Sequence, residues 1–432
     1  MRALTPIPDD SALHGGEPRQ TTCGGCELLC EDLTVQNIKS GTGCPIGDSW
    51  FTSNVSPAET TIDGRKASLH EAVNVAAERL LSAHQPLLTG LASTTLDAIQ
   101  TACRIADYID AAVDTNAHDN SCLTAPTTVR VGKVSADFEE LRDRADLAIC
   151  WGVDPFIKST RFIERFLQPK PQDGSRRIIS VGITPTLPPS SHNLHFPVPE
   201  DQLVSLARLV DAQLTHKRAG NSSCALHTIA NQLKKLIDTA RCVGFISTPT
   251  AETTGLVNWS LSQLIRSLAH QKPCFEIPLN QIVSQGGGNL AGASAVCTWR
   301  FGSSGAIPLA SSSGSMFLPA EADAQNLIKR NEVDCIFIVG RIPSQIKELL
   351  NKSSDPKTII HITDESNQTM LENSVRLGCA SLSDSTKGSM LRSDGRLISL
   401  RPFTTADAPS IQEILNQLLH RIVADVRNEG ST

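Results

Sequence analysis

Aromatic residues are scarce in this chain, and long apolar segments are absent from its sequence. Aromatic side chains make up 4% of the 432 residues and include a single tyrosine, so we expect a core of leucine, isoleucine, valine and alanine. No apolar run approaches the ~20 residues that a membrane-spanning helix needs. No basic start is followed by the apolar stretch of a secretory signal. We therefore expect a cytoplasmic protein without membrane contact.

An excess of positive charge is also lacking. The formal net charge is −6, which argues against a nucleic-acid-binding surface. The 13 cysteines do not indicate a disulfide scaffold, because the chain is long and carries no sign of secretion. Most of the nine that lie after Cys44 are in apolar runs, as Cys150, Cys242, Cys274 and Cys335 are, and we predict that these are buried, reduced thiols.

Four cysteines near the N-terminus form the most informative motif. The chain reads Cys23-Gly-Gly-Cys26-Glu-Leu-Leu-Cys30 and returns with Cys44 directly before a proline. Four sulfur ligands in so short a segment suit zinc or an iron–sulfur cluster, and the glycine pair lets the backbone turn tightly. The residues alone leave three states of the pocket open: an iron–sulfur cluster, zinc, or no metal.

Apolar strands alternate with helical patterns along most of the chain. This alternation predicts an α/β protein with parallel, doubly wound sheets that carry helices on both faces. A capping box at Ser68 and Glu71 predicts the start of a helix. Further helices are expected over 94–108 and 411–422, and strands near 87–89, 146–152, 178–182, 243–246, 335–340 and 359–362.

The chain is too long for one simple core, so several domains are expected. We expect a disordered N-terminus and a cysteine-cluster subdomain, followed by two α/β domains and a terminal helix. In order, these are residues 1–20, 21–60, a discontinuous first α/β domain of 61–145 with 330–405, a second, Rossmann-like domain of 146–329, and a helix in 406–432.

Ligands bind parallel α/β sheets at the carboxyl ends of the strands. Trp151-Gly-Val-Asp-Pro155 follows a predicted strand and is either a ligand loop or a plain turn. Ser284-Gln-Gly-Gly-Gly-Asn289 can approach a ligand closely, but it lacks the lysine of a phosphate-binding loop. We interpret His361, inside a predicted strand, as a structural histidine. The sequence contains neither a Gly-x-Ser-x-Gly nucleophile turn nor a His-Glu-x-x-His helix.

Several blocks, in order along the chain, resemble the B-type subunit of formylmethanofuran dehydrogenase, a family of molybdopterin oxidoreductases. Bacterial relatives of that family sit in the formyltransferase/hydrolase complex. No single block is decisive, but their order and spacing together are specific. The blocks are the cysteine motif with 44–51, 141–146 running into 150–155, 288–292 running into 296–299, 331–334 before the strand to 340, and 386–402.

The resemblance implies a molybdopterin-oxidoreductase-like fold with a small N-terminal subdomain of the iron–sulfur type. The family holds a [4Fe–4S] cluster with four cysteines near its N-terminus. Those positions fall on Cys23, Cys26, Cys30 and Cys44, so all four ligands are kept. The resemblance therefore assigns a [4Fe–4S] cluster to this pocket.

The family's catalytic positions carry different residues in this chain. Its Cys-His pair, whose cysteine ligates molybdenum or tungsten, falls on Asn120 and Ser121. An amide is a poor ligand for such a metal, and a hydroxyl does not relay protons near neutral pH as imidazole does. The catalytic arginine falls on Gln285, and an Asp-Pro-Arg turn for the pterin nucleotide is replaced by Gly182-Ile-Thr184. We expect no Mo/W-bispterin cofactor and no catalytic residue here, unless Cys122 serves the metal after a register shift.

Three functions follow from the resemblance. The first is a non-catalytic structural subunit of the formyltransferase/hydrolase complex, bound to partner subunits of the A, C and D types. That complex moves a formyl group from a tetrahydromethanopterin carrier to a furan carrier of the methanofuran type and hydrolyses it to formate, in formaldehyde oxidation. The second is an active Mo/W-pterin formylmethanofuran dehydrogenase subunit, and the third is an iron–sulfur electron-transfer module.

Overall fold

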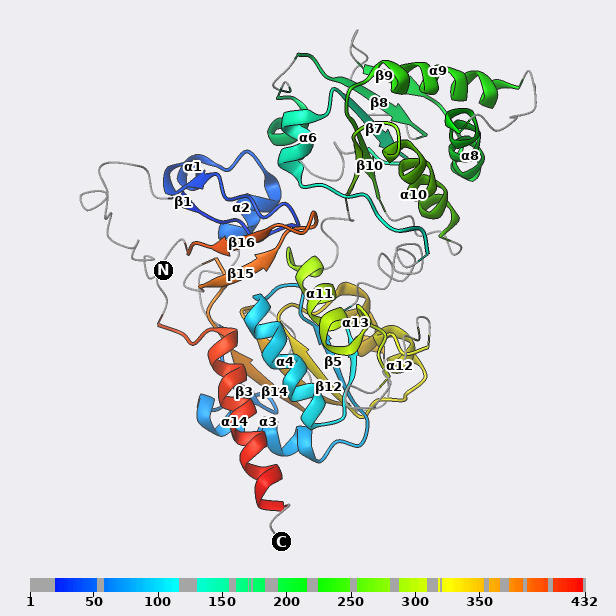
Figure 1. The fold of residues 1–432 in the computed structure, drawn as a ribbon. Helices are drawn as coiled ribbons and strands as arrows, with labels where there is room; N and C mark the ends of the chain where they lie inside the picture. Colours follow the sequence, from blue (N-terminus) through cyan, green and yellow to red (C-terminus); the bar gives the residue numbers. More distant parts are fainter. Residues whose placement is uncertain are drawn as a thin grey trace. The chain divides into compact units, whose positions relative to one another are not determined.

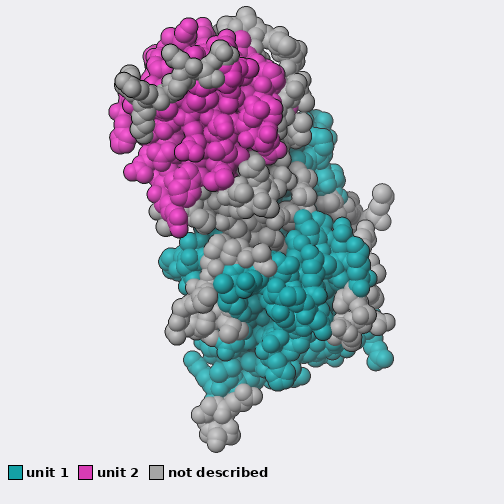
Figure 2. All heavy atoms as spheres, turned by 90° about the vertical axis from the view of Figure 1, so that its right-hand side faces the viewer, with its two compact units in different colours: residues 1–118, 283–392, 397–432 teal, residues 119–282, 393–396 magenta. Residues whose placement is uncertain are grey.

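The computed structural model divides the chain into two compact units, coloured teal and magenta in Figure 2. Unit 1 comprises residues 1–118, 283–392 and 397–432, and unit 2 comprises residues 119–282 and 393–396. The structure describes residues 20–52, 58–115, 130–154, 161–169, 171, 174–182, 193–215, 224–248, 255–279, 287–308, 318, 321–352, 357–365, 373–383, 387–402 and 407–429.

Unit 1 is built on a seven-stranded sheet with the strand order β4-β3-β14-β13-β12-β5-β6. The five strands from β14 to β6 are parallel, and β3 and β4 extend one edge in antiparallel pairing. The strands are β3 (Thr61–Ile62), β4 (Arg65–Lys66), β5 (Pro86–Gly90), β6 (Ala112–Asp114), β12 (Cys335–Val339), β13 (Thr358–Thr363) and β14 (Ser374–Gly378).

Helices cover both faces of this sheet (Figure 1). Successive residues of β12 point to opposite sides, so Phe337 and Val339 enter one core while Ile336 and Ile338 enter another. The first core contains α3 (Leu69–Leu81), α4 (Leu96–Tyr108), α11 (Leu290–Phe301) and α14 (Ile411–Glu429); the second contains α12 (Ala324–Lys329) and α13 (Ser344–Lys352). This arrangement confirms the predicted α/β class with parallel, doubly wound sheets, whereas the expected small N-terminal subdomain is not a separate unit, because residues 1–118 belong to unit 1.

The N-terminal cysteine segment and a hairpin complete unit 1. Thr22, just before the cysteine loop, is hydrogen-bonded to the second strand of the hairpin and to the chain that follows it. Its N–H donates to the Arg401 carbonyl, and its hydroxyl donates to the Ser399 carbonyl over 3.0 Å. The elements are β1 (Gln20–Thr21), β2 (Leu33–Thr34), α1 (Val35–Ser40), α2 (Pro45–Thr52), β15 (Gly388–Leu391) and β16 (Leu397–Leu400).

Unit 2 is built on a five-stranded parallel sheet with the order β11-β10-β7-β8-β9. Its strands are β7 (Leu147–Trp151), β8 (Arg177–Val181), β9 (Asn193–Phe196), β10 (Val243–Ser247) and β11 (Cys274–Pro278). One apolar core joins this sheet to α8 (Leu203–Leu214), α9 (Ala225–Thr239) and α10 (Leu256–Ala269). The other elements among the described residues of unit 2 are α6 (Phe138–Arg144), the π-helix η2 (Ile163–Leu167) and the short 3-10 helix η3 (Glu200–Gln202).

The unit boundaries differ from the domain boundaries expected from the sequence. Residues after 282 return to unit 1 rather than staying with the second domain to 329, because α11 packs through Ala293, Val296 and Cys297 into the core of the first sheet. The C-terminal helix α14 belongs to the same core. The expected disorder of residues 1–20 concerns a segment of which only Gln20 is described.

Local start signals in the sequence act as predicted. Ser68 caps α3 by accepting a hydrogen bond from Glu71 N–H at 3.2 Å, which satisfies one of the backbone donors that a helix start leaves unpaired.

Cys150, Cys242, Cys274 and Cys335 are buried as expected. No helix among the described residues is long and apolar enough to cross a membrane.

Candidate metal centre

The segment from Cys23 to Cys30 is a closed loop between β1 and β2. Cys23 N–H donates to the Cys30 carbonyl at 2.9 Å, and Leu29 N–H donates to the Cys26 carbonyl at 3.1 Å. Leu29 takes the left-handed backbone conformation that closes so tight a turn, with φ of 42°. Cys44 enters from the start of α2, where its carbonyl accepts from Asp48 N–H at 2.9 Å.

All four cysteines of the motif are buried. Burial raises the pKa of the Cys26 thiol well above its usual value, and the neighbouring thiols of Cys30, Cys23 and Cys44 raise it further. A thiolate at Cys26 is therefore disfavoured both by burial and by its neighbouring thiols. A bound metal cation would instead lower the pKa of the Cys26 thiol, because a cation stabilises thiolates.

The donor set therefore fits a four-sulfur metal site in its chemistry. No disulfide joins the described cysteines. Within the ranges that the structure describes, however, no three His, Cys, Asp or Glu side chains are drawn together closely enough to form a ready metal site. Holding a cluster would require the side chains of Cys23, Cys26, Cys30 and Cys44 to close on it.

The glycine pair of the loop lies against α2. A Cβ on Gly24 would lie 2.9 Å from the Trp50 ring, and a Cβ on Gly25 would lie 3.1 Å from both Ile46 and Trp50 side-chain atoms. The sequence predicted a tight turn at these glycines. The structure adds that the turn needs room for Trp50, so any side chain at Gly24 would push the loop away from α2.

The described end of the glycine-rich stretch, Gly287–Asn289, packs against the chain's own backbone. Gly287 contacts the Ala92 carbonyl, and a Cβ on Gly288 would lie 2.6 Å from the carbonyl oxygens of Gly24 and Cys26. The sequence predicted that this stretch could approach a ligand closely. Its described glycines instead approach the loop after β5 and the cysteine loop.

Asn289 ties these segments together, and sequence reasoning gave it no role. Its side-chain amide donates to the Thr94 carbonyl at 2.6 Å, and its side-chain oxygen accepts from Leu391 N–H at 2.8 Å. Its backbone N–H donates to the Ala92 carbonyl at 2.8 Å. One fully buried residue therefore fixes the loop after β5, the start of α11 and the strand β15 relative to one another.

The carboxyl edge of the first sheet meets the cysteine segment through Arg341. Arg341 N–H donates to the Ser93 hydroxyl at 2.7 Å, and its guanidinium lies 5.5 Å from the centre of the Trp50 ring. Its Nε atom also lies 3.8 Å from a Glu365 carboxylate oxygen. The contact with Trp50 is a cation–π interaction, and it joins the loop after β12 to α2.

His361 lies next to this edge in β13. Its Nε2 atom is 2.7 Å from the Gly340 carbonyl oxygen, and the ring is buried. Burial lowers the pKa of His361 to about 4, so the ring is neutral near pH 7 and donates its proton to that carbonyl. His361 is therefore a hydrogen-bonded structural histidine, as the sequence suggested.

The carboxyl edge of the second sheet carries two left-handed glycine turns. Gly152 and Gly182 have φ values of 64° and 97°, and both turns pack against Leu203 at the start of α8. Gly152 N–H donates to the Val181 carbonyl at 2.9 Å. The described part of 151–155 forms a tight turn, which is compatible with both interpretations, and Pro155 lies outside the described residues.

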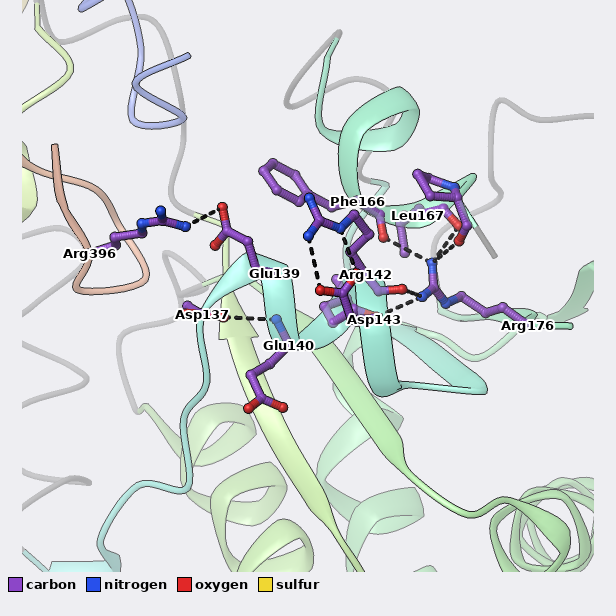
Figure 3. Close-up of polar contacts among 11 residues, drawn as sticks. Asp137, Glu139, Glu140, Arg142, Asp143, Phe166, Leu167, Arg176 and Arg396 are labelled. Carbon is purple, nitrogen blue, oxygen red and sulfur yellow. Dashed lines mark hydrogen bonds and ion pairs between the residues drawn. The ribbon is translucent and has the colours of Figure 1, made fainter. Parts of the chain in front are cut away.

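A buried arginine in unit 2 was not foreseen. The Arg176 guanidinium donates to six backbone carbonyls, at 2.6 to 3.0 Å, which tie the end of α6 to η2; part of this cluster is shown in Figure 3. Burial lowers its pKa to about 10, so it stays charged near pH 7. Nearby, Arg396 pairs with Glu139 at 2.7 Å.

The positions where this chain departs from the family's catalytic pattern are mostly not described. Asn120, Ser121, Cys122 and Gln285 lie outside the described residues. Of Gly182-Ile-Thr184, only Gly182 is described, in the turn beside Leu203. The proposed loss of the metal–pterin site therefore stays a prediction from the sequence.

The fold and the site define a two-unit α/β protein with a four-cysteine pocket beside its first sheet. No known family profile matches the chain. The B-type subunit of tungsten-containing formylmethanofuran dehydrogenase 2 from Methanocaldococcus jannaschii is 27% identical over 165 residues, which are 34% of this chain and 37% of that protein. The protein of the same name from Methanococcus maripaludis matches to the same extent. The match thus spans little more than a third of either relative.

The fold is also that of a solved chain in the formyltransferase/hydrolase complex FhcABCD from Methylorubrum extorquens, a structure determined with methylofuran. The likeness covers 85% of this chain and 99% of that chain, with a TM-score of 0.69 and 19% sequence identity. Together with the two dehydrogenase relatives, it confirms the resemblance to the B-type subunit of formylmethanofuran dehydrogenase that the sequence motifs indicate.

Proposed function

We propose that this chain is a non-catalytic structural subunit of a formyltransferase/hydrolase complex. The observation that carries the proposal is the near-complete fold match to a chain of FhcABCD, 99% of which is covered. Its partners in this proposal are subunits of the A, C and D types. The complex acts in tetrahydromethanopterin-linked one-carbon metabolism, where formaldehyde is oxidised to formate through a furan carrier of the methanofuran type.

The pocket of Cys23, Cys26, Cys30 and Cys44 holds a [4Fe–4S] cluster in this proposal. Support comes from the burial of all four thiols, their mutual electrostatic effect on Cys26, and the packing of Trp50 and Gly288 around the loop. A bound cluster supplies a one-electron redox centre. In a subunit without its own reaction, the same cluster cross-links the N-terminal loop to α2.

The Mo/W-bispterin cofactor is absent in this proposal. Support comes from the sequence, where an amide at Asn120 and a hydroxyl at Ser121 replace the metal ligand and the proton carrier, and Gln285 replaces the arginine. Hydrolysis and transfer of a formyl group need no redox metal, so the assembly surface can be kept while the metal site is lost.

Reconstitution tests this function. The chain is co-expressed with subunits of the A, C and D types, and the complex is purified through a tag on the A-type subunit. We expect stoichiometric recovery of this chain and formyl transfer with hydrolysis to formate. Recovery of an active complex that excludes the chain would overturn the proposed role.

An iron–sulfur electron-transfer module is the second candidate, and the four-thiol pocket is the observation that favours it. It shares the cluster with the structural proposal but requires that the cluster change oxidation state during turnover. A cysteine substitution in the assembled complex separates the two.

A further inference from the structure

A buried hydrogen-bond donor beside the cysteine loop has no acceptor. Trp50 on α2 is 4% exposed, and its indole Nε1 makes no hydrogen bond to any described residue. An indole nitrogen can only donate, and a buried donor without a partner costs free energy comparable to a lost hydrogen bond. The position therefore suits an acceptor that the protein's own residues do not supply.

Trp50 turns this donor towards the loop that carries three of the four thiols. A Cβ on Gly24 would lie 2.9 Å from Cζ2 and 3.2 Å from Cη2 of the ring. Cζ2 and Nε1 are bonded to the same ring carbon, so the N–H leaves the indole on the edge that contacts the loop. The unpaired donor thus lies against the turn between Cys23 and Cys26.

The ring is held in this orientation from two sides. The Arg341 guanidinium lies 5.5 Å from the ring centre, and a Cβ on Gly25 would lie 3.1 Å from the Trp50 Cβ. The Met390 sulfur lies 3.4 Å from the Cβ position of Gly24, but a thioether is a weak acceptor and it accepts no hydrogen bond from Nε1. Turning the donor towards another partner would break the contacts with Arg341 and the loop.

An unpaired indole is not a site in itself. Trp151 in unit 2 is 3% exposed, and its Nε1 also lacks a partner among the described residues. Trp50 differs because its edge contacts a loop with buried thiols. Ionised sulfur is a stronger acceptor than a neutral thiol, and hydrogen bonds to sulfur help to set the reduction potential of iron–sulfur clusters. A metal-bound sulfur is therefore the acceptor that suits this donor.

We infer that Trp50 is a positioning residue of the metal site, with its Nε1–H donating to a sulfur atom of the bound cluster. The inference rests on the proposed [4Fe–4S] cluster. It goes further by naming a residue outside the four cysteines that holds the cluster's sulfur. Donation to sulfur offsets part of its negative charge, so the bond favours the reduced state of the cluster.

The first test observes the indole N–H signals of the full-length chain by NMR, with isotope-labelled tryptophan. The chain has four tryptophans, and Trp50→Phe and Trp151→Phe assign two of the signals. Spectra are compared before and after a chelator removes the cluster. We expect the Trp50 signal to shift on removal and its exchange with solvent to accelerate about tenfold, as loss of one hydrogen bond implies. The Trp151 signal is the internal control and should not change.

The second test distinguishes a hydrogen bond from simple packing. Resonance Raman spectra of the loaded chain are recorded in water and in deuterium oxide, because an exchangeable donor on sulfur makes the iron–sulfur stretching bands sensitive to the isotope. We expect a smaller isotope shift in Trp50→Phe and an unchanged one in Trp151→Phe. The Trp50→Phe cluster should also be harder to reduce, with the ratio of reduced to oxidised cluster at a fixed potential lower by about tenfold.

The outcomes separate this inference from the proposed cluster. If the unchanged chain binds no iron, the cluster fails and the inference fails with it. If iron is bound and the isotope shift is equal in the two variants, Trp50 only packs beside the cluster, so the inference is wrong while the cluster stands. A Trp50 signal that does not respond to cluster removal has the same consequence. If Trp50→Phe loads no iron, the NMR comparison on the unchanged chain decides.

Discussion

The backbone of Gly288 packs directly on the carbonyl of Cys26: a Cβ at Gly288 would lie 2.6 Å from that oxygen. The contact joins residues that are far apart in the sequence, one in the cysteine loop and one at the start of α11. A backbone carbonyl cannot swing aside as a side chain does. The glycine therefore determines how closely α11 and the proposed cluster site approach.

Substituting Gly288→Ala should displace the cysteine loop. The added methyl group forces the backbone apart, and we expect a loss of about 1–3 kcal/mol in the free energy of unfolding together with a lower iron content after anaerobic purification. Iron analysis and denaturant unfolding measure the two effects.

Gly302→Ala is the control for this change. Gly302 ends the same helix, and a Cβ there meets no atom within 4 Å, although its φ of 79° adds strain. We expect about 1 kcal/mol of destabilisation with unchanged iron. Equal iron content in both variants would show that the Gly288 contact does not shape the site.

Removing the guanidinium of Arg176 should destabilise unit 2. Arg176→Met leaves buried carbonyls of α6 and η2 without their donor, and we expect a loss of about 3 kcal/mol. Arg177→Met is the matched control, because Arg177 is exposed, and its effect should stay within about 0.5 kcal/mol. Urea unfolding followed by circular dichroism compares them, and equal midpoints would contradict the structural role of the buried guanidinium.

His361 should make the chain less stable in mild acid. Its pKa is lowered from 6.5 to about 4 in the folded chain, so the unfolded state binds the proton more readily. The contribution of neutral His361 to the free energy of unfolding is fully present above pH 6.5 and is lost as the pH falls towards 4. At pH 5 the loss is about 2 kcal/mol relative to pH 7.

The variant His361→Gln isolates this effect, because glutamine cannot titrate but can still donate to the Gly340 carbonyl. We expect its unfolding free energy to fall less than that of the unchanged chain between pH 7 and pH 5. Parallel curves for the two proteins would show that His361 does not titrate as its burial requires.

Cys26→Ser separates a structural cluster from an electron-carrying one. In the assembled complex, the structural account expects the variant to lose iron and to lower the stability of unit 1, while formyl transfer stays nearly unchanged. Cys242→Ser, a buried cysteine of unit 2, is the control and should keep its iron. If turnover falls to zero while the variant complex remains assembled, the electron-transfer account is correct instead.

Local patterns were sufficient to predict much of the fold. The Ser68 cap, the helix over 94–108 and the buried strand around His361 depend on residues close together in the sequence, and the structure contains each of them. Alternation of such elements is enough to predict parallel sheets. The predicted second domain extended to residue 329, beyond the end of unit 2 at 282. The sequence pattern of α11 does not show which of the two sheets this helix covers.

Local sequence patterns could not predict which residues hold the site and unit 2 in place. Asn289 looks like the end of a glycine loop, and its role depends on Thr94 and Leu391, which lie far away along the chain. Arg176 directly precedes another arginine, and such a pair is typical of an exposed segment. Only the fold shows that its guanidinium is surrounded by backbone carbonyls. The four cysteines, by contrast, are recognisable from their spacing alone.

The central claim is a subunit that keeps its four-cysteine site and has lost its metal–pterin site. Metal analysis with a UV–visible spectrum on the anaerobically purified complex tests both parts together. The account predicts about four iron atoms and the broad absorption of a [4Fe–4S] cluster for each copy of this chain, without molybdenum or tungsten. About one molybdenum or tungsten per chain would contradict it.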